Sequence, residues 1–247
     1  MKWLVLVFIV IVIGCIFVAA IPEGPDSISR GVSERKTLAG GGSTQQAEGG
    51  NITPLFISTE RVTKRWQGYY GNISGGILLD DAAGNSLYSW GLAEPSGEIY
   101  ASNYSTVTWT NIDCINFTTN TSVLKYNVSE LNAFIGYGEG EQGFLDSING
   151  TFNQTFGNDG STFQVGSRTI NNADNCSMVT LYNASGYQTD LYREVLLTDN
   201  TSIIFTALIS QNKRGFNNII ADFQMIVGVN GTVDGTVRNY YFFVELS

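Results

Sequence analysis

The residues of this chain with the clearest chemistry are asparagines that can accept an N-linked glycan. Twelve Asn-x-Ser/Thr sequons lie downstream of residue 50, whereas 22 asparagines and 43 serines and threonines in 247 residues would give about four by chance. Such a glycan is added to a chain that is exported across a membrane. The predicted glycosylation sites are Asn51, Asn72, Asn103, Asn116, Asn120, Asn127, Asn149, Asn153, Asn175, Asn183, Asn200 and Asn230.

Some of these sequons have a second explanation. Asn149-Gly150-Thr151 and Asn230-Gly231-Thr232 contain Asn-Gly, the pair that favours tight hairpin turns. A chain rich in Asn and Thr also forms sequons by accident, and accident accounts for about a third of this set. These positions can therefore serve as turns whether or not a glycan is attached.

Catalytic chemistry has little support in the composition. The chain has no histidine, which removes the commonest general base and the commonest metal ligand. Two carboxylates about 5 to 9 Å apart can still hydrolyse a glycoside, and the available acids are Asp80 with Asp81, Glu139 with Glu141, and Asp222. Acids in Gly-rich turns are ordinarily solvated, so we expect no enzyme, no catalytic residue and no cofactor.

A calcium ion is the alternative for the acidic turn at residues 80–85. Asp80, Asp81 and Asn85, arranged around Gly84, supply the oxygen ligands that calcium prefers. Their spacing does not fit the EF-hand loop, and hairpin turns attract Asp, Asn and Gly for backbone reasons alone. We therefore expect a turn here and assign no metal.

An aromatic cluster that follows Arg65 is the best candidate for a binding surface. Trp66, Tyr69 and Tyr70 lie close together among glycines. If they are exposed, they can stack on sugars or form an interaction patch. The alternative is that they are core aromatics at the entry to the first sheet, with glycines where the backbone is closely approached.

Residues 3–21 form an unbroken apolar run that predicts a membrane-crossing helix. At about 1.5 Å per residue, nineteen residues span about 28 Å. Lys2 precedes the run and acidic residues follow it, so the N-terminus is expected inside and the remainder outside. The length of the run favours a retained anchor. Val18-Ala19-Ala20 also fits signal-peptide cleavage, and Val12-Ile13-Gly14-Cys15 loosely fits lipidation of Cys15.

The remaining chain divides into a linker and an exterior domain. Residues 22–50 are rich in Gly, Ser and Gln and predict a flexible tether, after the anchor or signal at residues 1–21. Residues 51–247 are expected to form the domain, with order beginning near Ile52 or Leu55. Beyond residue 20 the chain carries 12 basic and 22 acidic side chains, a net charge of 12 − 22 = −10, which gives no footprint for nucleic acid.

The three cysteines of the chain bear on whether the protein is folded in an oxidising compartment. Cys15 belongs to the apolar run, which leaves Cys114 and Cys176 in the exterior domain. In an oxidising exterior two thiols most simply form one disulfide. The alternative is two free, buried thiols.

Short strands broken by turns predict an all-β fold, an Ig-like β-sandwich with a small helical insertion. The expected strands are residues 73–79, 86–90, 97–102, 105–110, 190–198, 203–209, 219–229 and 237–246. The last strand is apolar on both faces, which places it inside the sheet. A short helix is expected at 129–135, with 142–148 as a second candidate.

Several motifs resemble those of a group of exported archaeal cell-surface proteins. They are RWQGYYGN at 65–72, GNSLYSW at 84–90, DFQM at 222–225 and YYFFVEL at 240–246. The similarity spans about residues 49–247 and is weakest at 115–188. The resemblance implies an exported surface protein of uncharacterised role and offers no catalytic residues to carry over. It also adds to the case for pairing the two exterior cysteines.

These features predict an exported, N-glycosylated cell-surface protein with a structural or interaction role in the envelope or an appendage. It would be anchored in the cytoplasmic membrane through residues 3–21, or secreted if that segment is cleaved. Expected partners are the membrane, the N-linked glycans, and other copies or other surface proteins. The alternative is a surface binding module, either an adhesin or a protein that captures solute or glycan. Exposure of Trp66, Tyr69 and Tyr70 on a groove favours binding, and their burial favours a structural part.

Overall fold

The computed structural model shows a molecule built mostly of strands, which confirms the all-β class. It describes residues 21–37, 44–58, 61–91, 94–117, 128–137, 144–183, 185, 188–230 and 237–246. Among these residues, no helix is both long enough and apolar enough to cross a membrane. The predicted anchor or signal lies outside them, except for its last residue, Ile21.

The strands are β1 (Trp66–Gly71), β2 (Gly76–Asp80), β3 (Ser86–Gly91), β4 (Gly97–Ser102), β5 (Asp113–Cys114), β6 (Gln154–Thr155), β7 (Phe163–Val165), β8 (Arg168–Ile170), β9 (Ser177–Tyr182), β10 (Gln188–Thr198), β11 (Ile203–Leu208), β12 (Lys213–Arg214), β13 (Ile220–Ala221), β14 (Phe223–Gly228) and β15 (Tyr241–Leu246). The helices are α2 (Val128–Phe134) and α3 (Ile148–Thr151), with 3-10 turns η1 (Trp109–Asn111), η2 (Asn172–Asp174) and η3 (Phe216–Asn218).

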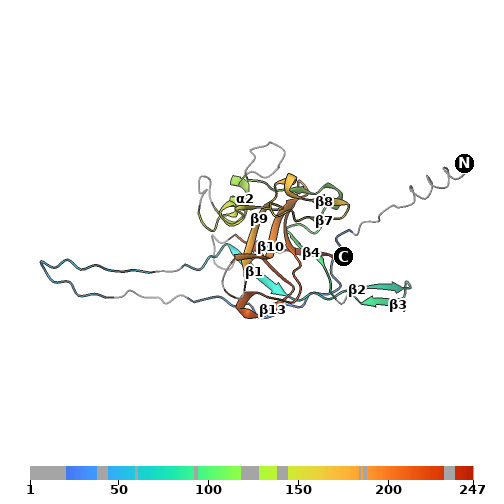
Figure 1. The fold of residues 1–247 in the computed structure, drawn as a ribbon, viewed down its shortest axis with the longest axis horizontal. Coiled ribbons are helices and arrows are strands. Elements are labelled where there is room, and N and C mark those ends of the chain that lie inside the picture. Colours follow the sequence, from blue (N-terminus) through green and yellow to red (C-terminus); the bar gives the residue numbers. More distant parts are fainter. Residues whose placement is uncertain are drawn as a thin grey trace, which may run out of the picture.

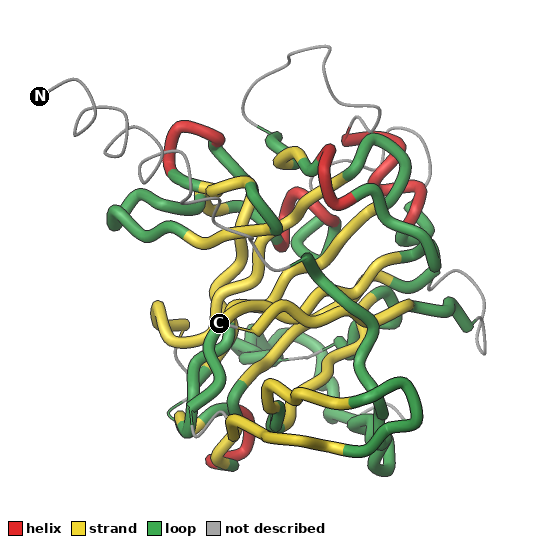
Figure 2. Tube along the Cα trace, turned by 90° about the vertical axis from the view of Figure 1, so that its right-hand side faces the viewer, coloured by secondary structure: helices red, strands yellow, loops and turns green. Residues whose placement is uncertain are grey.

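A seven-stranded antiparallel sheet forms the centre of the molecule (Figure 2). Its strands follow the order β15-β4-β11-β10-β9-β6, and β5 pairs with β10. The turn between β10 and β11 is closed by Asp199, whose carboxylate accepts hydrogen bonds from the backbone N–H groups of Thr201 and Ser202 at 2.9 and 2.6 Å. Asn200 adopts the left-handed conformation there, at φ 67°, which asparagine tolerates better than most residues.

One face of the main sheet is covered by the β1–β14 pair together with α2 and α3. Strand alternation places Leu196 of β10 and Phe205 of β11 on this face. They pack with Met225 and Val227 of β14 and with Leu131 of α2. Because all five side chains are buried, this cluster holds the second layer against the sheet.

The opposite face of the sheet has its own apolar cluster. Val195 and Leu197, which alternate with Leu196, point to this side. The β7–β8 hairpin covers them with Phe163 and Val165. The main sheet is therefore packed on both faces, which agrees with the apolar character of both sides of its strands.

Two sequence predictions about strands are wrong. Residues 105–110 do not pair with β4, because Val107 and Trp109 lie in a loop and η1 and pack over the second cluster instead. Strand β15 lies at the edge of the main sheet, not inside it. Both of its faces are apolar because both are covered: Phe242 packs against one apolar cluster and Phe243 against the other.

The predicted helices and the start of order also differ in detail. Helix α2 confirms the helix expected at 129–135, whereas the second helix, α3, begins only at the end of the 142–148 segment. Gly150 lies in α3, so Asn149-Gly150 is not a hairpin turn. The first regular strand begins at Trp66, later than the start expected near Ile52 or Leu55.

Two elements project from the body on opposite sides (Figure 1). The chain leaves the edge of β15, where Glu23 and Val244 exchange backbone hydrogen bonds of 3.0 and 2.8 Å. It then runs out to a distant tip and returns to β1; residues 44–58 of this excursion, all exposed, are called the arm. On the other side the β2–β3 hairpin extends away from the body.

Candidate interaction surface

The three aromatic residues predicted as a binding surface lie in two different environments in the structure. Trp66 packs against Phe152 and Phe205, with ring centroids 5.9 and 6.2 Å apart. Tyr69 makes an edge-on contact with Phe242 at 5.6 Å. Both side chains are therefore partly buried against the core cluster. Tyr70 alone is exposed.

Asp146 is the residue around which the chain that leads into β1 is fixed. Its backbone carbonyl accepts a 2.8 Å hydrogen bond from the indole N–H of Trp66, and its carboxylate accepts one of 2.8 Å from the hydroxyl of Thr63. Tyr137 donates a further hydrogen bond to this carboxylate. The guanidinium of Arg65 lies 3.5 Å from the centre of the Tyr137 ring. These contacts fix the entry to the first strand, which is a structural role.

The exposed Tyr70 borders a groove on the outer face of the β1–β14 pair. Its ring lies 5.4 Å from that of Phe216, which is also exposed. Gln224 holds the floor, since its side-chain amide donates to the carbonyl of Tyr182 at 3.0 Å and its carbonyl accepts from the backbone N–H of Phe216. Residues 30–34 of the tether line the same groove.

The β2–β3 hairpin presents the largest apolar feature that sequence reasoning missed. Every residue from 74 to 91 is exposed, so the hairpin packs on none of the other residues that the structure describes. The register Ile77↔Trp90 and Leu79↔Tyr88 places these four side chains on one face. The rings of Tyr88 and Trp90 contact each other at 4.7 Å. The hairpin therefore carries an apolar face without a covering layer.

The turn of this hairpin is held by its own acidic residue. The Asp81 carboxylate accepts hydrogen bonds from the backbone N–H groups of Ala83 and Asn85 and from the Asn85 side chain, at 2.7 to 2.9 Å. The Asn85 side chain, followed by its backbone N–H, lowers the pKa of Asp81. This backbone role accounts for the Asp-Asn-Gly composition. Among the described residues, no three acidic or cysteine side chains are grouped as a metal site requires.

The described sequons divide into exposed and half-buried positions. The exposed asparagines are Asn51, Asn72, Asn153 and Asn175, and the half-buried ones are Asn103, Asn116, Asn149, Asn183, Asn200 and Asn230. Asn120 and Asn127 lie outside the described residues. The longest interval without a sequon among the twelve, residues 73–102, contains the entire β2–β3 hairpin.

Some half-buried sequon asparagines already have a structural role. The side-chain carbonyl of Asn103 accepts a 2.7 Å hydrogen bond from the backbone N–H of Ile203, which secures the start of β11. The side-chain carbonyl of Asn149 accepts from the Asn132 amide at 3.3 Å and from the Ser147 hydroxyl at 3.0 Å. These side chains contribute to the fold independently of any glycan.

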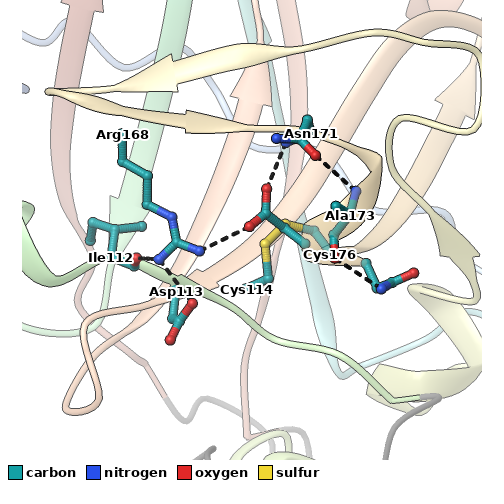
Figure 3. A network of polar contacts seen from close by, with 9 residues as sticks. Ile112, Asp113, Cys114, Arg168, Asn171, Ala173 and Cys176 are labelled. Carbon is teal, nitrogen blue, oxygen red and sulfur yellow. Dashed lines mark hydrogen bonds and ion pairs between the residues drawn. A yellow bond between two sulfur atoms is a disulfide. The ribbon is translucent and has the colours of Figure 1, made fainter.

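Cys114 and Cys176 form the predicted disulfide, with their Cα atoms 4.7 Å apart and a sequence separation of 62 (Figure 3). Both cysteines are buried. Beside them, Arg168 forms ion pairs of 2.9 and 3.0 Å with Asp113 and Asp174. Burial opposes the charge of Arg168, but the two carboxylates prevail and raise its pKa. The disulfide and this network join β5, β8 and the start of β9.

Three buried glutamates were not among the acids singled out in the sequence. Glu98 and Glu245 face each other on β4 and β15, and Glu194 of β10 is fully buried. One oxygen of Glu194 accepts a 2.8 Å hydrogen bond from the backbone N–H of Ile226, and the other has no partner. Burial raises the pKa of Glu194 well above its ordinary value and so favours its protonated form. In the sequence, the alternation of these glutamates with apolar residues along the strands could have indicated that they are buried.

The acids considered for catalysis are not brought together. Asp222 accepts backbone hydrogen bonds from Ile73 and Asn212 at 3.0 and 2.9 Å, which ties β14 to its neighbours. Glu139 and Glu141 lie outside the described residues. The facing pair Glu98 and Glu245 is covered by the β7–β8 turn, whose Gly166 N–H donates to Glu245 at 3.0 Å.

No family model matches the chain, and no curated protein or solved structure matches it either.

Proposed function

We propose that the protein is an exported, N-glycosylated cell-surface protein with a structural or interaction role in the envelope or an appendage. The observation that carries this proposal is the β2–β3 hairpin, which exposes Ile77, Leu79, Tyr88 and Trp90 in the longest interval without a sequon. A two-stranded hairpin alone is at best marginally stable in water. A partner that covers its apolar face accounts for both the projection and the lack of glycan sites.

The cell-surface location is supported by four further features. The disulfide between Cys114 and Cys176 fits an oxidising exterior. Exposed sequon asparagines are available for glycans, and the apolar run at 3–21 supplies either an anchor or a cleavable signal. The motifs that resemble archaeal surface proteins agree with this location. In this proposal the exterior domain is an Ig-like β-sandwich in which the β1–β14 pair is the second layer.

The contacts made by the candidate binding and catalytic residues favour a structural role over catalysis. Trp66 and Tyr69 pack into the core instead of forming an open platform. Asp81 and Asp222 satisfy backbone N–H groups in turns. The proposed role therefore involves no catalytic residue and no cofactor.

The experiment that tests the proposal is extraction of the glycosylated protein from its native membranes, followed by mass measurement in solution and glycopeptide mapping. We expect glycans on the exposed sequons and a particle heavier than one glycosylated chain. Unmodified asparagines, or a single chain with no associated protein, would contradict the proposal.

The alternative is a surface binding module that uses the groove beside Tyr70. Exposed Tyr70 and Phe216 above a floor of Gln224 combine aromatic faces with amide groups, a composition suited to a sugar. Tyr70→Ala should then abolish retention of the protein on immobilised glycans, while Trp66→Ala would act only through stability. Equal retention of Tyr70→Ala and the unaltered protein would exclude this use of the groove.

A further inference from the structure

Tyr70 and Phe216 form an exposed aromatic pair that belongs to neither apolar cluster of the core. Their ring centroids lie 5.4 Å apart, and the two residues are 45% and 60% exposed. Both rings border the groove, whose volume of about 770 Å³ lies within the range of about 300 to 1,000 Å³ that is usual for small-ligand sites. A ring-shaped ligand therefore has room to stack on the aromatic pair.

The aromatic pair is held in place by Gln224. This residue lies directly opposite Tyr70 in the β1–β14 register. Its side-chain carbonyl accepts the backbone N–H of Phe216, and its amide donates to the carbonyl of Tyr182 at 3.0 Å. Gly215 permits this approach, since a Cβ at that position would collide with the side-chain oxygen of Gln224. The two rings are therefore positioned before any ligand arrives, which lowers the entropic cost of binding.

A sequon asparagine, Asn72, lies two residues after Tyr70. Asp222 holds the chain on both sides of it: its backbone N–H donates to the carbonyl of Gly71 at 2.9 Å, and its carboxylate accepts from the N–H of Ile73 at 3.0 Å. Because alternate residues of an extended chain point to the same side, Asn72 lies on the face of Tyr70. Asn72 is also exposed, so a glycan attached to it extends from the side of the aromatic pair.

The spacing between ring and acceptor occurs once in this chain. Among the twelve sequons, only that of Asn72 has an aromatic residue two positions before the asparagine; the other eleven have Gly, Ala, Cys, Ser, Thr, Lys or Leu there. Two residues of extended chain cover about 7 Å, so the first sugar on Asn72 is close enough to lie over Tyr70. The C–H face of a sugar ring suits the electron-rich face of an aromatic ring.

We infer that the N-linked glycan of Asn72 folds back on its own protein, with its first sugar stacked on Tyr70 and Phe216. The C–H groups of the sugar cover the rings, and its hydroxyl groups remain hydrated. Weak stacking is sufficient, because so short an attachment gives an effective concentration in the millimolar range. This inference rests on the proposed function, since it requires the glycan, and it gives that glycan a structural role.

A sugar on another molecule is a poorer occupant of the same rings. The carbonyl and the amide of the Gln224 side chain already bond to Phe216 and Tyr182. A free sugar would gain the stacking contact with few of the hydrogen bonds that fix the orientation of a ligand. The glycan of Asn72 is held by a covalent bond and does not need them.

The test is hydroxyl-radical footprinting of the full-length glycosylated protein, after glycopeptide mapping has established occupancy at Asn72. Ser74→Ala removes the sequon and keeps Asn72, whereas Asn153→Gln removes another exposed sequon and is the matched control. Since a stacked sugar covers one of the two faces of a ring, Tyr70 and Phe216 should be oxidised about twofold more slowly in the unaltered protein than in Ser74→Ala. Asn153→Gln should leave both rates unchanged.

Thermal unfolding gives a second measurement of the same contact. Ser74→Ala should lower the midpoint by about 2 °C, the size expected for one stacking contact in a chain of this length. In a Tyr70→Ala background, the same substitution should leave the midpoint unchanged, because the surface for the sugar is absent. Equal shifts in the two backgrounds would overturn the inference.

The outcomes separate this inference from the proposed function. Equal oxidation of the aromatic pair with and without an attached glycan at Asn72 overturns the stacking and leaves the surface role intact. An unmodified Asn72 in a protein that carries glycans at Asn153 has the same meaning. A protein without glycans at any sequon overturns both. Retention of the Asn72-glycosylated protein on immobilised glycans, lost in Tyr70→Ala, would show that the rings are open to a free sugar and would also overturn the inference.

Discussion

Glu98 and Glu245 occupy directly opposite positions on the neighbouring antiparallel strands β4 and β15, with only 8% and 7% of each residue exposed. Burial, followed by the nearby Glu245 carboxylate, raises the pKa of Glu98 to about 8. Burial also raises the pKa of Glu245, although hydrogen bonds from Gly166 and Tyr100 favour its charged form. The core of this acidic protein therefore contains a carboxyl group that stays protonated at neutral pH.

This pair predicts that the domain loses stability as the pH rises. The folded protein holds the Glu98 proton more tightly than the unfolded chain, so its contribution is complete below the ordinary pKa of 4.5. The free energy of unfolding should fall by about 1.4 kcal/mol per pH unit between that value and pH 8. Denaturant unfolding at pH 4, 6 and 8 measures the slope. Glu98→Gln should reduce this slope by about 1.4 kcal/mol per pH unit, whereas exposed Glu34→Gln should leave it unchanged.

Removal of the disulfide should destabilise the β-rich domain. Cys114 and Cys176 close a loop of 62 residues, for which the chain-entropy model gives about 4 kcal/mol. The double variant Cys114→Ser with Cys176→Ser should unfold at a correspondingly lower denaturant concentration. An unchanged midpoint would show that the Arg168 ion pairs hold this junction without the covalent bond.

The same disulfide should compete with glycosylation at Asn175. The sequon residues Cys176 and Ser177 are buried, so the folded strand does not expose them to a transferase. Modification must therefore precede closure of the disulfide, and Cys114→Ser should raise glycan occupancy at Asn175. Glycopeptide mass spectrometry measures this. Occupancy at Asn51, on the arm, serves as the control and should not change.

The aromatic cluster should separate into structural and surface residues. Trp66→Ala removes two ring contacts and the hydrogen bond to Asp146, and should cost about 3 kcal/mol of stability. Tyr70→Ala removes an exposed ring and should cost less than about 1 kcal/mol. Comparable losses for the two variants in thermal unfolding would contradict this assignment.

The strands of the sheet could be predicted where local pattern determines structure. Alternation marked β10 and β11, and the Asp-Gly-Asn composition marked the turn between β2 and β3. The disulfide followed from a count of cysteines. The edge position of β15 could not be predicted in the same way. Apolar residues on both faces of a strand indicate that layers cover it from both sides, but they do not indicate whether another strand pairs with it on each side.

The candidate surface was missed for a related reason. Apolar residues in a strand predict burial, but Leu79 and Trp90 are exposed because no other element of the described chain covers them. The same composition at Trp66 is covered by Phe152. Only the arrangement of elements separates the two cases. The gap in sequons at 73–102 was the one sequence feature that distinguished the hairpin.

We propose that the exposed, sequon-free hairpin joins the protein to neighbours at the cell surface. Electron microscopy of the full-length glycosylated protein from native membranes, with Trp90→Ser prepared in parallel, tests it most directly. We expect filaments, rings or a lattice for the unaltered protein and dispersed particles for the variant. Discrete single chains in both preparations would contradict it.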